Sequence, residues 1–217
     1  MAQVILDSKL PSTRKAFDFA WMTLKKQLGL FIASMLTFFA VWVILEVIVV
    51  AGQRFGFLLW VIAHLSFLII FAGMEIGFIR ICLAFHDGKE IHYTEIFREL
   101  RFGINFLFVQ LVYFVMILVG FVLLIVPGIY LGSKYTLYAF HFADGYSNLR
   151  QSFQQSAMIS QGSRWFLFWF SVFIFLLNIL GASLLGIGLI ITMPLSLLMK
   201  TSIYCQLRAT STDAQYS

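Results

Sequence analysis

Residues 102–133 contain no charged side chain, and this run constrains the fold more than any other stretch of the chain. A helix rises ~1.5 Å per residue, so the run is longer than one crossing of a ~30 Å bilayer core requires. Pro127 and Gly128 interrupt it. Proline removes a backbone donor, and glycine tolerates the backbone angles of a reversal. We therefore expect a helical hairpin in a membrane, with its turn at Pro127 and Gly128.

The composition of the whole chain agrees with this interpretation. Of 217 residues, 61% are hydrophobic and only 12% are charged. A soluble domain carries about 25% charged residues, so this chain cannot cover its apolar surface with its own polar groups. The sequence predicts one all-α, polytopic integral membrane domain over residues 1–217.

Apolar runs divide the chain into six predicted transmembrane helices, arranged as three hairpins. Their approximate ranges are 29–51, 55–83, 103–126, 129–145, 165–180 and 184–204. The fourth is short for a crossing, so it either crosses, thins the bilayer or re-enters from the same side. Pro194 should kink the sixth helix. Residues 1–10 and 208–217 are predicted to be tails.

An interfacial amphipathic segment precedes the first, third and fifth spans. The first is a helix over 12–28, capped by a hydroxyl residue of Pro11-Ser12-Thr13, with Trp21 in the aromatic belt. The second lies before Arg101, and the third is a helix capped by Ser147. Every basic residue except Arg54 and Lys134 then falls on one side of the membrane. The positive-inside rule therefore places both termini in the cytoplasm.

Several polar residues fall inside predicted spans, where a charge costs roughly 2.5–3.5 kcal/mol. Glu46 and Lys134 have compatible depths, so they either form an ion pair or reach the headgroups separately. A second group lies toward the cytosolic ends of the second and third spans. We expect an inter-helical hydrogen-bond cluster there in preference to a proton relay; its members are Glu75, Arg80, Asn105 and Gln110.

Patterns that carry chemistry are absent from the sequence. It has no nucleophile elbow, metalloprotease helix, P-loop or dinucleotide fingerprint, and no histidine–cysteine spacing of a metal site. Cys82 and Cys205 are not expected to form a disulfide. A basic aromatic platform for nucleic acid is also missing. We therefore expect a non-enzymatic protein without cofactor or metal, which binds membrane lipids, another membrane protein or a second copy of itself.

The alternative function is a small transporter or channel component. Glu46, Glu75 and Lys134 would then belong to a polar pathway, as intramembrane ionisable groups often do. Flux in proteoliposomes would separate the two hypotheses.

Short motifs in the second half of the chain suggest a family. They are Val126-Pro127-Gly128-Ile129-Tyr130, then Ser152, Ser156, Gly162 and Trp165, and finally Thr192-x-Pro194-Leu195 and Tyr204-x-x-Leu207. Together they resemble bacterial six-span membrane proteins, which include the membrane domain of some glycerophosphoryl diester phosphodiesterases and the YciC-like inner-membrane proteins. The resemblance implies a six-helix fold in a bacterial inner membrane. It carries no catalytic residues over, because the phosphodiesterase barrel has no counterpart here.

Overall fold

The computed structural model describes residues 10–54, 56–89, 94–145, 148–183 and 186–213, and these residues form helices joined by turns and short connections. The predicted all-α class is confirmed. Five helices are long and apolar enough to cross a membrane: Leu28–Gln53, Phe57–His86, Glu95–Leu123, Arg164–Ser183 and Leu189–Ser211. Such helices satisfy their own backbone hydrogen bonds, which a lipid environment requires. Within the described residues, the six predicted spans are therefore not all continuous helices.

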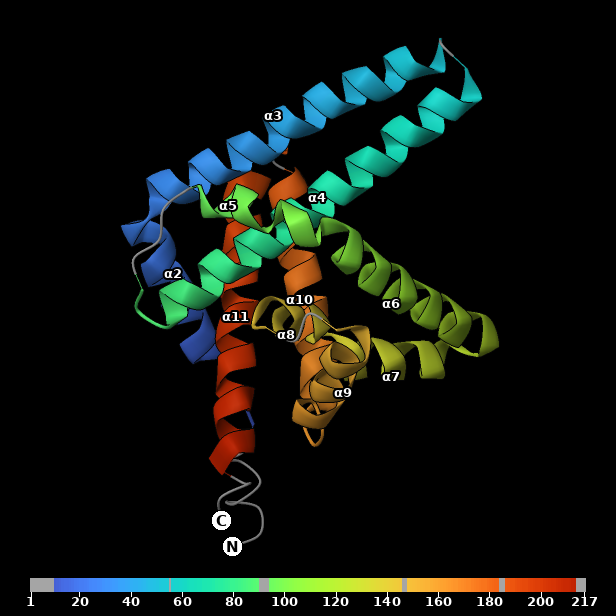
Figure 1. Ribbon diagram of the computed structural model, residues 1–217. Coiled ribbons are helices and arrows are strands. Elements are labelled where there is room, and N and C mark those ends of the chain that lie inside the picture. The colour runs from blue at the N-terminus through green and yellow to red at the C-terminus, as the bar shows by residue number, and fades with distance from the viewer. Residues whose placement is uncertain (1–9, 55, 90–93, 146–147, 184–185, 214–217) are drawn as a thin grey trace, which may run out of the picture.

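The first hairpin follows an amphipathic helix, α2 (Thr13–Lys26), and consists of α3 (Leu28–Gln53) and α4 (Phe57–His86). The side chain of Ser12 caps α2 by accepting the N–H of Lys15, as predicted. α3 and α4 run antiparallel to a tip that projects away from the other helices (Figure 1). Large apolar side chains near that tip are exposed, for example Phe57 and Leu58. A surface of this kind needs lipid or protein around it.

The turn of the second hairpin is a correction to the sequence prediction. α6 (Gly103–Leu123) ends before α7 (Ile125–Tyr135), and Leu124 between them is extended. Pro127 and Gly128 therefore lie in the first turn of α7. A proline is tolerated there because first-turn N–H groups have no partner within the helix. Gly128 allows close helix packing, since a Cβ on Gly120 of α6 would lie 2.9 Å from its Cα.

The fourth predicted span, 129–145, is broken in the structure. α7 ends at Tyr135, and a separate short helix, α8, covers Tyr138–Ala143. The 11 residues of α7 extend only ~16 Å, too little for a ~30 Å core. Ser160 explains part of the break, because its hydroxyl donates to the backbone carbonyl of Lys134 at 2.9 Å. That carbonyl would otherwise accept the next helical N–H.

The third hairpin consists of α10 (Arg164–Ser183) and α11 (Leu189–Asp213), preceded by α9 (Leu149–Ile159). Asn148 caps α9 through its side chain, whereas the predicted cap, Ser147, lies outside the described residues. α11 continues beyond the predicted end at 204, so the predicted tail is helical as far as Asp213. A long-range bond helps to hold this extension, because the backbone N–H of Ser12 donates to Gln206 Oε1 at 2.8 Å.

α11 is the most buried of the five long helices and occupies the centre of the fold (Figure 1). Helices α2, α3, α4, α9 and α10 pack against it. Pro194 is buried within α11, and the helix continues through it. The buried residues of α4 lie between Ala72 and Leu83, toward the end of that helix that follows its exposed tip. The core therefore lies near the amphipathic segments, while the α3–α4 and α6–α7 hairpins diverge toward their tips (Figure 1).

Candidate functional site

The first candidate surface is a stripe of exposed side chains on α2, which we call the α2 stripe: Phe17, Trp21 and Lys25. The rings of Phe17 and Trp21 stack with centroids 6.2 Å apart, and Lys25 Nζ lies 4.9 Å from the centroid of the Trp21 ring. One helical turn separates neighbouring members, so all three share a face. The buried residues of α2 (Ala16, Ala20 and Leu24) belong to the adjoining face, and the helix packs on α11. Because α2 is fixed on α11, the α2 stripe remains on the exposed side of the helix.

The second amphipathic segment is fixed to α4 by backbone packing. α5 (Glu95–Arg98) continues into a 3-10 turn, η1 (Glu99–Phe102), and both pack on α4. A Cβ on Gly77 would lie 2.8 Å from Ile96 Cα, and one on Gly73 would lie 2.8 Å from Leu100 Cα. Only glycine permits this approach. It brings Glu99, only 2% exposed, to Arg80, whose Nη1 donates to Glu99 Oε1 at 2.5 Å.

A polar centre lies between α4, α6 and α11. Gln110 Nε2 donates to Glu75 Oε2 at 2.6 Å, and the ammonium of Lys200 interacts electrostatically with the Glu75 carboxylate. Glu75 lies ~16 Å along α4 from the last residue of that helix, His86, a distance of about half the ~30 Å thickness of a bilayer core. Tyr138 of α8 is also within electrostatic range of Glu75. We call Glu75, Gln110, Lys200 and Tyr138 the polar centre. Glu75 is exposed, so the carboxylate is not sealed inside the bundle.

A further polar network ties α11 to the turn that follows α8. Asp144 Oδ2 accepts a hydrogen bond from the hydroxyl of Tyr204 at 2.8 Å and forms an ion pair with Arg208. The Tyr204 hydroxyl also lies 3.4 Å from Nδ1 of His141.

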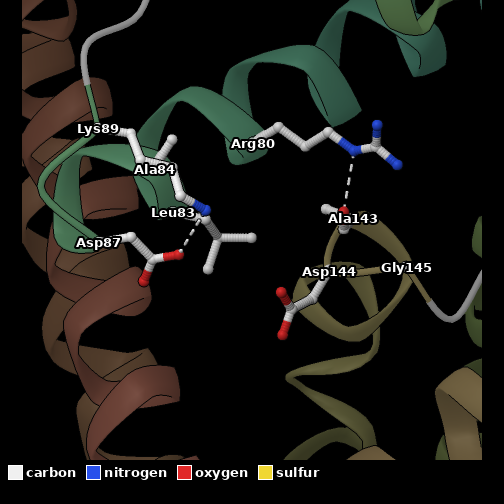
Figure 2. Close-up of a pocket in the computed structure, with 8 residues that line it drawn as sticks. All are labelled: Arg80, Leu83, Ala84, Asp87, Lys89, Ala143, Asp144 and Gly145. Atoms are coloured by element: carbon white, nitrogen blue, oxygen red, sulfur yellow. Dashed lines mark hydrogen bonds and ion pairs between the residues drawn. The ribbon is translucent and has the colours of Figure 1, made fainter.

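A shallow pocket of ≈ 310 Å³ opens beside this network. Its lining comes from the C-terminal end of α4, the segment after it and the turn after α8 (Figure 2). Four of the residues are charged: Arg80, Asp87, Lys89 and Asp144. Lys89 Nζ lies 3.3 Å from Asp87 Oδ2, and Arg80 Nε donates to the carbonyl of Ala143 at 2.9 Å. The pocket therefore presents both signs of charge.

The structure brings together only part of the predicted polar set. Gln110 does bond to Glu75, but Arg80 turns to Glu99 and Ala143 instead, and Asn105 is exposed and bonds to neither Glu75 nor Arg80. The predicted cluster of four is thus two separate sites.

Of the two alternatives predicted for Glu46 and Lys134, the ion pair is not formed in the structure, which describes both residues. Glu46 is exposed on α3, and α7, which carries Lys134, belongs to a hairpin that projects in another direction (Figure 1). The Lys134 ammonium lies 4.9 Å from the centroid of the Tyr135 ring. Similar depths along two helices do not decide which helices are neighbours.

Four functional candidates were missed from the sequence: Glu99, Asp144, Lys200 and Tyr204. Glu99 and Asp144 were assigned to polar connections, and Lys200 was counted as a cytosolic charge. The partners of Glu99, Asp144 and Tyr204 lie between 19 and 64 residues away along the chain, and Lys200 is farther still from its partner, Glu75. The one sequence feature that could have indicated such a site is Lys200, a charged residue within an otherwise apolar run.

Among the described residues, no group of three or more His, Cys, Asp or Glu side chains could hold a metal ion. Compared with known proteins, the chain matches no family model, no curated protein and no solved structure. The family resemblance of the second half therefore stays a prediction. The described residues offer an aromatic and basic surface on α2, a polar centre and a pocket of mixed charge.

Proposed function

We propose that the protein is a non-enzymatic multi-pass protein of a bacterial inner membrane, which binds anionic lipids at its interfacial helices. The observation that supports this most is the α2 stripe. An aromatic pair beside a lysine suits the boundary between headgroups and acyl chains, where rings sit at headgroup depth and lysine reaches phosphate. Because α2 is anchored on α11, the stripe needs no ordering before it binds lipid.

The charges of α2 favour anionic lipid over neutral lipid. Its four basic residues are all exposed, against a single acidic residue, Asp18; the basic residues are Arg14, Lys15, Lys25 and Lys26. Each basic residue near an anionic surface contributes about 1 kcal/mol. The resulting attraction extends over roughly a Debye length, so it collects anionic lipid around the protein as well as beneath it.

The proposed topology has both termini in the cytoplasm and α2, α5 and α9 at the cytoplasmic surface. The chain crosses six times, with α7 and α8 forming a broken fourth crossing that ends at the interface. The bond between Arg80 and Ala143 supports this return, because it joins the end of α8 to the cytosolic part of α4.

Lipid binding by α2 can be tested with the double variant Lys25→Gln/Lys26→Gln. Native mass spectrometry of the protein in mild detergent, titrated with palmitoyl-oleoyl phosphatidylglycerol, measures the affinity directly. Loss of two positive charges should weaken binding by between about tenfold and thirtyfold. Arg54→Gln is the matched control, because Arg54 is exposed beyond α3, beside the opposite tip. Equal weakening in the control, or none in the double variant, would refute the proposal.

A second candidate function is transport, which the polar centre favours. An exposed carboxylate near the middle of the bilayer, with an amide and an ammonium beside it, is an expensive arrangement that membrane proteins usually retain for a pathway. Glu46 and Lys134 have no part in this centre, and Lys200 takes the role expected of Lys134. The pocket of Figure 2 is lined by neither Glu75 nor Lys200, so it does not extend such a pathway.

Proton flux into proteoliposomes, followed with an internal pH dye, tests this second function. Glu75→Gln should abolish a flux that uses the polar centre, whereas Glu46→Gln should leave it at the wild-type rate. A wild-type protein with no flux above that of empty liposomes, or a flux that survives Glu75→Gln, would exclude proton movement through Glu75.

A further inference from the structure

We infer that the pocket between α4 and the turn after α8 is a binding site for a zwitterionic phosphoethanolamine group. This inference rests on the proposed lipid-binding function and names a second lipid class at a separate place. The pocket is lined by two basic side chains (Arg80 and Lys89) and two acidic ones (Asp87 and Asp144).

The surrounding ion pairs keep the pocket neutral overall. The Glu99 carboxylate compensates the positive charge of Arg80, and the Arg208 guanidinium compensates the negative charge of Asp144. A purely anionic ligand would meet the carboxylates of Asp87 and Asp144, and a purely cationic one would meet Lys89 and Arg80. A ligand that carries both charges avoids these repulsions, and electrostatic complementarity decides specificity at such a site.

The positions of the charges suit the two ends of the ligand. In Figure 2 Lys89 and Asp87 lie on one side of the pocket and Asp144 lies on the other, while the guanidinium of Arg80 lies above Ala143 and points away from Lys89. A phosphate can accept from Lys89, as charge-assisted bonds favour. A primary ammonium can donate to the carboxylates. Asp144 keeps Oδ1 for this purpose, because both of its bonds, from Tyr204 and Arg208, use Oδ2.

The location of the pocket is that of a lipid headgroup. It lies at the cytosolic end of α4, beside η1, where Arg80 and Arg101 both lie over the ring of Phe102. Leu83, Ala84 and Ala143 add apolar lining, against which the glycerol region of a lipid can rest. Each charged side chain of the pocket remains partly exposed, so a headgroup can reach it without any movement of the helices.

Native mass spectrometry with three palmitoyl-oleoyl lipids tests the assignment: phosphatidylethanolamine, phosphatidylcholine and phosphatidylglycerol. Phosphatidylethanolamine should bind about tenfold more tightly than phosphatidylcholine, because a quaternary ammonium cannot donate hydrogen bonds to the carboxylates. Asp87→Asn should remove this preference, whereas Lys89→Gln should weaken the binding of both lipids about equally, because both carry the phosphate. Asp144 is left unchanged because it also holds Tyr204 and Arg208. Glu95→Gln is the matched control, since Glu95 pairs with Arg98 outside the pocket.

The outcomes separate this inference from the proposed function. Phosphatidylglycerol binding, read in the same spectra, reports on α2 alone. Equal affinity for phosphatidylethanolamine and phosphatidylcholine, or a preference that survives Asp87→Asn, would overturn the pocket assignment and leave the α2 result standing. Free phosphoethanolamine distinguishes the source of the group: if it binds as tightly as the lipid, the ligand is soluble, and if it binds more weakly, the ligand is the lipid headgroup.

Discussion

Gly77→Ala should lower the free energy of unfolding by about 3 kcal/mol, at the upper end of what overpacking costs. The added methyl would meet the backbone of Ile96, 2.8 Å away at Cα and closer at the carbonyl oxygen. A clash with backbone cannot be relieved by a rotamer change, so α5 and η1 must move off α4. That movement also separates Glu99 from Arg80. Thermal melting in detergent should show a fall of roughly 6–12 °C.

Gly29→Ala is the matched control for this substitution. Gly29 is also helical, near the start of α3, and a Cβ there would have no neighbour within 4 Å. Alanine is the better helix former by up to about 1 kcal/mol, so this variant should melt at the wild-type temperature or slightly above it. If Gly77→Ala and Gly29→Ala have the same melting temperature, the close packing of α5 on α4 does not stabilise this part of the fold.

The second large effect concerns the ion pair between Arg80 and Glu99, and we expect it to be asymmetric. Arg80→Met leaves the Glu99 carboxylate buried without a cation, which costs about 3–5 kcal/mol. Glu99 Oε2 makes the cost severe, because it is buried and receives no hydrogen bond from the described residues. Glu99→Gln leaves a guanidinium that is 35% exposed and still bonded to Ala143, so it should cost only about 1–2 kcal/mol.

The double variant Arg80→Met/Glu99→Gln should be more stable than Arg80→Met alone, since no uncompensated charge remains buried. Chemical unfolding in mixed micelles measures all four free energies. Arg98→Met supplies a control at an exposed pair, where breaking the Arg98–Glu95 contact should cost less than about 1 kcal/mol. Equal losses for Arg80→Met and Glu99→Gln would show that the burial of Glu99 does not govern the pair.

The amino-acid sequence predicted most of the helices because apolar periodicity and length decide them. The Ser12 cap, the amphipathic segment before α3 and the apolar helices all follow from local residue types. The position of the turn in the second hairpin does not follow from local residue types. A Pro-Gly pair is a strong local turn signal, yet here the reversal occurs at Leu124, and Gly128 serves the packing of α7 on α6. Tertiary packing overrode a local preference.

The candidate site was harder to predict than the fold. Gln110 was matched with Glu75 because both are polar residues at similar depth in adjacent helices. The other contacts depend on which helices meet. Arg80 finds Glu99 only because glycines let η1 approach α4, and Lys200 finds Glu75 only because α11 lies at the centre. Neither fact has a signature in local sequence. For the α2 stripe the sequence predicted only Trp21 in the aromatic belt, and its alignment with Phe17 and Lys25 is a finding of the structure.

The central claim is that the interfacial helices share one face of the membrane, opposite the hairpin tips. Cysteine labelling in intact cells tests it most directly, because Cys82 and Cys205 are buried and give little background. Single cysteines are placed at Met22 on α2, Gln53 at the end of α3 and Gln154 on α9, all exposed positions. A membrane-impermeant maleimide should label Gln53→Cys in intact cells, and Met22→Cys and Gln154→Cys only after permeabilisation. Labelling of Gln154→Cys in intact cells would contradict the claim, because α9 would then lie outside.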